Sequence, residues 1–138
     1  MSPSALALVG YAAWSLLLSI WILSYRTGLV LTKKHAVNGF DPDGSDVSAF
    51  SARLCRTHAN CYENLPIFGS LILVAMFTDN AAITDPLARW ALLARFAQSI
   101  THLISDNELA VAIRAGFWSA QLGIMAYWVY QLGMLGFQ

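Results

Sequence analysis

The chain has 138 residues, of which 57% are hydrophobic and 12% are charged, and its formal net charge is zero. A soluble domain carries about twice this charged fraction, and a chain without excess positive charge is not suited to a nucleic-acid partner. The composition therefore predicts an integral membrane protein. We expect a single all-α domain over residues 1–138.

The first predicted helix covers about residues 4–31. Ala5 to Tyr25 contains no charged residue, and roughly 20 apolar residues of helix cross the hydrocarbon core of a bilayer. No basic residue precedes this segment, and its apolar stretch exceeds the about 7–15 residues of a signal peptide. We therefore expect a membrane-spanning helix that is not cleaved.

A polar loop is expected over about residues 32–51, and its charges predict the topology. It contains Lys33 and Lys34, whereas the later connection TDNAAITD contains no Lys or Arg. By the positive-inside rule, the loop faces the cytoplasm and both termini lie outside. The segment FDPDGSD lacks the spacing and the distal Glu of a calcium loop, so we expect a solvated turn there.

Three further helices are expected over about residues 52–78, 86–104 and 108–137. Asp85 as an N-cap and Pro86 at the first helical position indicate where the third helix begins. The residues Ser105-Asp106-Asn107-Glu108 form a capping-box pattern before the fourth. Four membrane-spanning helices are the preferred count. Three membrane-spanning helices are the alternative, although this count leaves one amphipathic stretch unassigned.

Polar side chains from all four predicted helices gather in the cytoplasmic leaflet, and the first helix contributes Arg26. Helical spacing places three of them on one face of the second helix and three on one face of the third, and another lies near the start of the fourth. Charges inside a bilayer are costly and usually mark a functional site. An excess of arginine over carboxylate favours a small anionic or zwitterionic ligand. The residues on the other three helices are Arg56, Asn60, Glu63, Arg95, Gln98, His102 and Arg114.

The segment RLCRTHANCYENLPIF, residues 53–68, closely resembles the signature of the membrane-associated proteins in eicosanoid and glutathione metabolism, the MAPEG family. The resemblance extends over the whole chain and is nearest to the bacterial branch. It implies a four-helix membrane bundle that forms a homotrimer, with glutathione sites between subunits that open to the cytoplasm. It also implies a location in the bacterial inner membrane.

The resemblance further implies roles for individual residues, with glutathione as cosubstrate. The helix 4 arginine, Arg114, faces the thiol in the enzymes of the family, and Lys33, Lys34 or Arg26 represents a basic residue at the end of helix 1. Enzymes of the family often have Ser and Tyr where this chain has Ala115 and Trp118, a difference that bears on thiol activation. Glutathione is held by Arg56, Asn60 and Glu63, with further contacts from Arg95, Gln98 and His102.

The expected activity is that of a membrane-bound glutathione transferase or peroxidase that acts on a lipophilic electrophile or hydroperoxide. A non-catalytic, lipid-binding trimer of the same fold and a small transporter are the alternatives. A metal site formed by Cys55, His58 and Cys61 is not expected, because the two cysteines are six residues apart and do not share a helix face.

Overall fold

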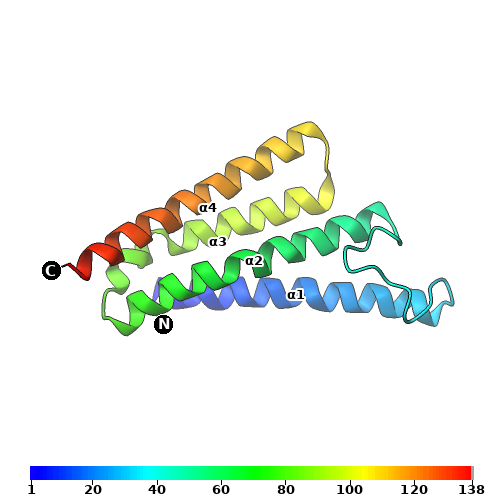
Figure 1. The fold of residues 1–138 in the computed structure, drawn as a ribbon, viewed down its shortest axis with the longest axis horizontal. Coiled ribbons are helices and arrows are strands. Elements are labelled where there is room, and N and C mark those ends of the chain that lie inside the picture. Colours follow the sequence, from blue (N-terminus) through cyan, green and yellow to red (C-terminus); the bar gives the residue numbers. More distant parts are fainter. Residues whose placement is uncertain (138) are drawn as a thin grey trace.

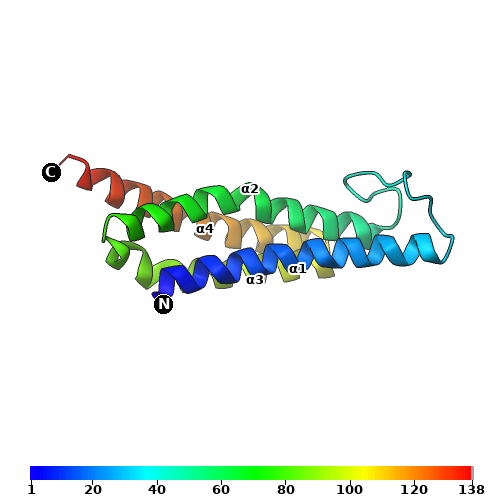
Figure 2. The same ribbon diagram turned by 90° about the horizontal axis from the view of Figure 1, so that it is seen from below.

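The computed structural model describes residues 1–137 as a bundle of four antiparallel helices (Figures 1 and 2). The helix with the fewest residues has 24 of them, and at about 1.5 Å per residue it is long enough to cross a hydrocarbon core of about 30 Å. The predicted all-α, four-helix architecture is confirmed. The helices are α1 (Pro3–Leu31), α2 (Ala49–Phe77), α3 (Ala81–Ile104) and α4 (Glu108–Leu135).

Three of the helices, α1, α2 and α4, are long and apolar enough to cross a membrane. The third, α3, is less apolar because it contains Asp85, Arg89 and Arg95. It nevertheless runs alongside the other helices (Figure 1) and packs against all three of them. Within the described residues, α1 does not contact α4. The two therefore lie on opposite sides of the central α2–α3 pair.

Aromatic side chains from three helices form part of the core. The ring centroids of Tyr11 and Phe68 are 5.0 Å apart, and those of Phe68 and Trp128 are 5.8 Å apart. All three residues are at most 2% exposed. Contacts of this kind add to the stabilisation that comes from burying apolar surface, and here they join α1, α2 and α4.

The start of α3 differs from its prediction. The helix begins at Ala81, and Pro86 lies inside it. The Asp85 carboxylate accepts a hydrogen bond of 3.0 Å from the backbone N–H of Ser4, and the hydroxyls of Ser4 and Thr84 are 2.7 Å apart. The prediction of an Asp85 N-cap was wrong because α3 begins four residues before Asp85, with Asn80 as its N-cap. The Asp85 carboxylate instead satisfies a free N–H group in the first turn of α1.

The start of α4 is capped by a different residue from the one the sequence suggests. Asn107 is the N-cap, and its side-chain oxygen accepts a hydrogen bond of 2.8 Å from the backbone N–H of Ala110. Ser105 lies at the end of α3, and its hydroxyl accepts from the N–H of Asn107. The predicted capping box was wrong because the turn uses Ser105 to close the end of the preceding helix.

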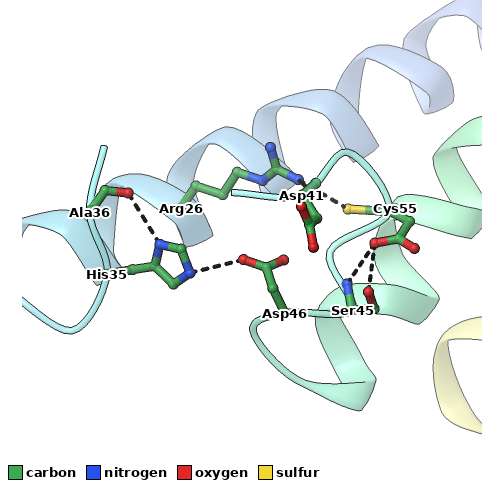
Figure 3. Close-up of polar contacts among 8 residues, drawn as sticks. Arg26, His35, Ala36, Asp41, Ser45, Asp46 and Cys55 are labelled. Carbon is green, nitrogen blue, oxygen red and sulfur yellow. Dashed lines mark hydrogen bonds and ion pairs between the residues drawn. The ribbon is translucent and has the colours of Figure 1, made fainter. Parts of the chain in front are cut away.

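The loop between α1 and α2 is held in place by side chains at both ends (Figure 3). One guanidinium nitrogen of Arg26 donates to the carbonyl of Asp41 at 2.8 Å and lies 3.7 Å from the Cys55 sulfur. The imidazole Nε2 of His35 is 2.9 Å from the Asp46 carboxylate. These contacts tie the loop to itself and to the adjacent ends of both helices.

The Asp-rich part of this loop forms a turn stabilised by its own side chains. The carboxylate of Asp43 accepts hydrogen bonds from the backbone N–H and the hydroxyl of Ser45, and these bonds lower the pKa of the Asp43 carboxyl. Gly44 has a φ of 70°, a conformation that glycine adopts without steric cost.

The contact between Asp85 and α1 predicts a loss of stability when it is removed. We expect Asp85→Ala to reduce the free energy of unfolding by about 1 kcal/mol, a typical value for loss of a helix-capping side chain. The matched control is Asp106→Ala, which removes an exposed carboxylate from the α3–α4 turn. Thermal unfolding in detergent measures the difference, and equal midpoints for the two variants would show that the contact contributes nothing.

Candidate functional site

A cavity of about 480 Å³ lies between α2, α3 and α4. Its lining residues come from the first part of α2, the end of α3 and the first turns of α4. These segments lie toward the end of the bundle that carries the α3–α4 turn and the α1–α2 loop (Figure 1). The cavity volume falls within the range of about 300–1,000 Å³ typical of small-molecule sites. It is lined by Arg56, Asn60, Glu63, Asn64, Gln98, His102, Val111, Arg114, Ala115 and Trp118.

The structure brings together all but one of the polar residues singled out from the sequence. The α2 residues lie on one helix face because they are separated by four and three positions, and the two α3 residues are separated by four. Arg114 reaches the same cavity from α4. The six residues that meet here are Arg56, Asn60, Glu63, Gln98, His102 and Arg114.

The remaining predicted residue, Arg95, does not reach this cavity. It is only 1% exposed, and it lines a separate small hollow together with Asn64 and Gln121. Its guanidinium lies 5.3 Å from the ring centroid of Tyr11. Among the described residues, none of its three side-chain nitrogens has a hydrogen-bond partner. Arg95 is therefore a buried cation behind the cavity wall rather than part of the wall.

Two polar residues that the sequence analysis did not single out contribute to this region. Asn64 lines both the cavity and the Arg95 hollow, and its side chain donates to the carbonyl of Asn60 at 2.9 Å. Gln121 donates to the side-chain oxygen of Gln98 at 3.0 Å. Helical spacing could have indicated both, because Asn64 is four residues after Asn60 and Gln121 is seven residues after Arg114.

The charged groups of the cavity are available to a ligand. The wall contains two guanidiniums, from Arg56 and Arg114, and one carboxylate, from Glu63. Within residues 1–137, the ion pair between His35 and Asp46 is the one salt bridge, so these three charges are not paired with each other. A ligand with two negative groups and one positive group would complement them.

Hydrogen-bonding groups surround these charges. The Asn60 side-chain nitrogen and the His102 Nδ1 are 3.5 Å apart, a long contact that joins α2 to α3. Gln98 is 8% exposed and His102 is also 8% exposed, so both present only a small surface to the cavity. The α2 and α3 side of the cavity can therefore recognise the polar groups of a ligand.

The α4 side of the cavity is different in character. Apart from Arg114, α4 contributes Val111, Ala115 and Trp118 to the lining. Val111 and Trp118 are each 45% exposed on a membrane-spanning helix. The cavity consequently has a polar wall on one side and an exposed apolar edge on the other, an arrangement that suits the meeting of a polar and a lipophilic molecule.

The described residues do not suggest a metal centre. Within residues 1–137 there is no group of three or more His, Cys, Asp or Glu side chains arranged to hold a metal ion. Cys55 and Cys61 are both free and buried. Cys61 lies 3.8 Å from the hydroxyl of Ser99 in the core, which is a packing position.

Together, these features define a membrane-embedded four-helix protein with a charged cavity near one end. The model of the MAPEG family matches residues 4–134, nearly the whole chain, and the protein belongs to this family. The family includes glutathione transferases and peroxidases, and its members use glutathione. Searches of curated proteins and of solved structures found no match.

Proposed function

We propose that this protein is a membrane-bound, glutathione-dependent transferase or peroxidase that acts on lipophilic electrophiles or hydroperoxides. The observation that carries the proposal is the convergence of α2, α3 and α4 on one cavity whose charges complement glutathione. At neutral pH, glutathione has two carboxylates, one ammonium group and a thiol. Arg56 and Arg114 can attract its negative groups, and Glu63 can bind its ammonium group.

The α2 and α3 residues hold the tripeptide in this proposal. Arg56 forms a charge-assisted hydrogen bond with a carboxylate, Glu63 accepts from the ammonium group, and Asn60 binds a peptide group. Gln98 and His102 add hydrogen bonds from the opposite wall. Contacts from all of these groups place the thiol on the α4 side, near the apolar edge of the cavity.

Arg114 activates the thiol. The reference pKa of a cysteine thiol is about 8.5, so only a few per cent is thiolate at neutral pH. A guanidinium within about 4–6 Å lowers the pKa of an acid by roughly 1–3 units. The resulting thiolate attacks the electrophilic carbon, and a carbon–sulfur bond forms as the leaving group departs with the electron pair of its own bond.

A hydroperoxide would react at the same sulfur. The thiolate attacks the terminal oxygen, the oxygen–oxygen bond breaks, and the alkoxide takes a proton to leave as an alcohol. The glutathione sulfenic acid then condenses with a second glutathione to give the disulfide and water. In both reactions the chain's own residues bind glutathione and stabilise the thiolate.

The position of the cavity supports an entrance from the cytoplasm, with both chain termini on the opposite side of the membrane. The loop that contains Lys33 and Lys34 is at the same end of the bundle as the α3–α4 turn, and both termini are at the opposite end (Figure 1). The positive-inside rule assigns the lysine-containing end to the cytoplasm. We further propose a homotrimer in a bacterial inner membrane, in keeping with the resemblance of the sequence to bacterial members of the family.

A second candidate function is non-catalytic lipid binding on the same fold. It is favoured by Ala115 and Trp118, which line the cavity where related enzymes often have Ser and Tyr. The cavity therefore lacks two hydroxyl groups that would assist thiol chemistry. In this case the protein would bind a lipophilic molecule without turning over glutathione.

Calorimetric titration of the purified protein with glutathione in detergent tests the proposal, combined with assays of chlorodinitrobenzene conjugation and of lipid hydroperoxide reduction. Saturable binding together with either activity supports a transferase or peroxidase. Glutathione binding without either activity, or lipid binding without glutathione binding, would favour the second candidate.

A further inference from the structure

Gln98 and Gln121 form a hydrogen-bonded pair between α3 and α4, directly behind the cavity. Gln121 is 3% exposed. Its Nε2 donates to the Gln98 Oε1 at 3.0 Å and to the backbone carbonyl of Phe117 at 2.9 Å. Of the two glutamines, only Gln98 lines the cavity.

The orientation of the Gln121 amide follows from its neighbours. The carbonyl of Phe117 can only accept a hydrogen bond, so the Gln121 amide must direct its nitrogen toward it. Gln121 also lines the small hollow that contains Arg95, whose guanidinium has no hydrogen-bond partner among the described residues. Because a guanidinium can only donate, the orientation that Phe117 requires is compatible with this second neighbour.

The orientation of Gln121 then determines that of Gln98. The Gln121 NH₂ group has two hydrogens, one for the Phe117 carbonyl and one for Gln98. Gln98 must meet this donor with its oxygen, which leaves its own NH₂ group as the part that can reach the cavity. Without this constraint, a glutamine could offer either an acceptor or a donor to a ligand.

We propose that Gln121 is a positioning residue that holds Gln98 as a hydrogen-bond donor toward an acceptor group of glutathione, a carboxylate or a peptide carbonyl. Gln121 itself does not contact the ligand. The inference rests on the proposed function and extends it, because it assigns a donor role to Gln98 and identifies α4 as the element that enforces this role.

The test is a double-mutant cycle, with glutathione binding measured by calorimetry in detergent. Loss of a hydrogen bond to a charged or polar ligand group costs roughly tenfold in affinity. We expect Gln121→Met and Gln98→Met each to weaken binding about tenfold, and the double variant to bind no more weakly than Gln98→Met alone. The control is Gln131→Met, a glutamine on α4 outside the cavity lining, which should bind like the wild type.

A second variant tests the direction of the hydrogen bond. In Gln121→Glu, the carboxylate accepts from Gln98, so the Gln98 amide turns and presents its oxygen to the ligand. We expect this variant to bind glutathione more weakly than Gln121→Met, although its new carboxylate can pair with the buried Arg95. Thiolate absorbance at saturating glutathione should remain at the wild-type level for Gln121→Met, since Arg114 is unchanged.

The outcomes separate the two proposals. If the wild type binds glutathione and both Gln121 variants bind it with wild-type affinity, the positioning role is wrong while the proposed function stands. Additive losses in the double variant would also overturn it, because they would show that Gln121 acts independently of Gln98. If the wild type itself does not bind glutathione, the proposed function fails and this inference fails with it.

Discussion

Replacing Arg114 with alanine is expected to abolish most of the thiolate formed by bound glutathione at neutral pH. Without the guanidinium, the thiol pKa should return toward about 8.5. Because the wild-type pKa is expected to be roughly 1–3 units lower, the pH titration of thiolate absorbance should shift upward by that amount. Turnover of any electrophile at neutral pH should fall by about tenfold or more.

The matched control for this experiment is Arg89→Ala. Arg89 is an exposed arginine on α3 that lies 5.5 Å from the Trp90 ring and does not line the cavity. The Arg89→Ala substitution should leave the pH titration of thiolate absorbance unchanged. An Arg114→Ala protein that binds glutathione and shows the same thiol pKa as the wild type would assign thiol activation to another group.

Replacing Arg56 with alanine is expected to weaken glutathione binding roughly 10- to 100-fold. Arg56 lines the cavity, and a charge-assisted hydrogen bond to a carboxylate contributes about 1.5–3 kcal/mol, which corresponds to this range. Because Arg56 is assigned to the tripeptide and not to the sulfur, the thiol pKa of glutathione bound at saturation should stay close to its wild-type value.

Comparison of the Arg56 and Arg114 variants separates binding from activation. Calorimetry reports affinity, and ultraviolet absorbance at saturating glutathione reports thiolate. The assignment predicts that Arg56→Ala chiefly lowers the affinity for glutathione, whereas Arg114→Ala chiefly lowers the amount of thiolate formed. If Arg56→Ala had wild-type affinity, the carboxylate would have to be bound elsewhere, and the orientation of glutathione proposed here would be incorrect.

Much of this site could be predicted from the sequence because helical periodicity determines which residues share a face. The spacing of Arg56, Asn60 and Glu63 predicts one face of α2, and that of Gln98 and His102 one face of α3. The distribution of lysine and arginine predicts that these faces lie at the same end of the bundle as Arg114. Helical periodicity, together with the alternating direction of the helices, therefore predicts that these residues lie near one another.

The position of Arg95 could not be predicted in this way. Its spacing from Gln98 suggests a shared face, but a helix packed against three neighbours presents different parts of that face to different partners. The Arg95 side chain lies against Tyr11 of α1, whereas Gln98 lies against Gln121 of α4. Which neighbour a side chain meets depends on helix packing, and periodicity alone does not contain that information.

The hydrogen bond between Asp85 and the first turn of α1 illustrates the same limit. Local patterns relate a capping residue to its own helix, but the Asp85 carboxylate binds the backbone N–H of Ser4, far away in the sequence. The N-terminus of α1 must first be packed beside α3 before this partner becomes available. The local pattern also misplaces the start of α3, which lies at Ala81, before Asp85.

The most direct test of the central claim is the ultraviolet absorbance of wild-type protein titrated with glutathione at neutral pH in detergent. The proposed function predicts a thiolate signal that increases with glutathione, saturates, and has the same midpoint as the calorimetric binding curve. Absence of both a thiolate signal and binding heat would contradict the assignment of this cavity as a glutathione site.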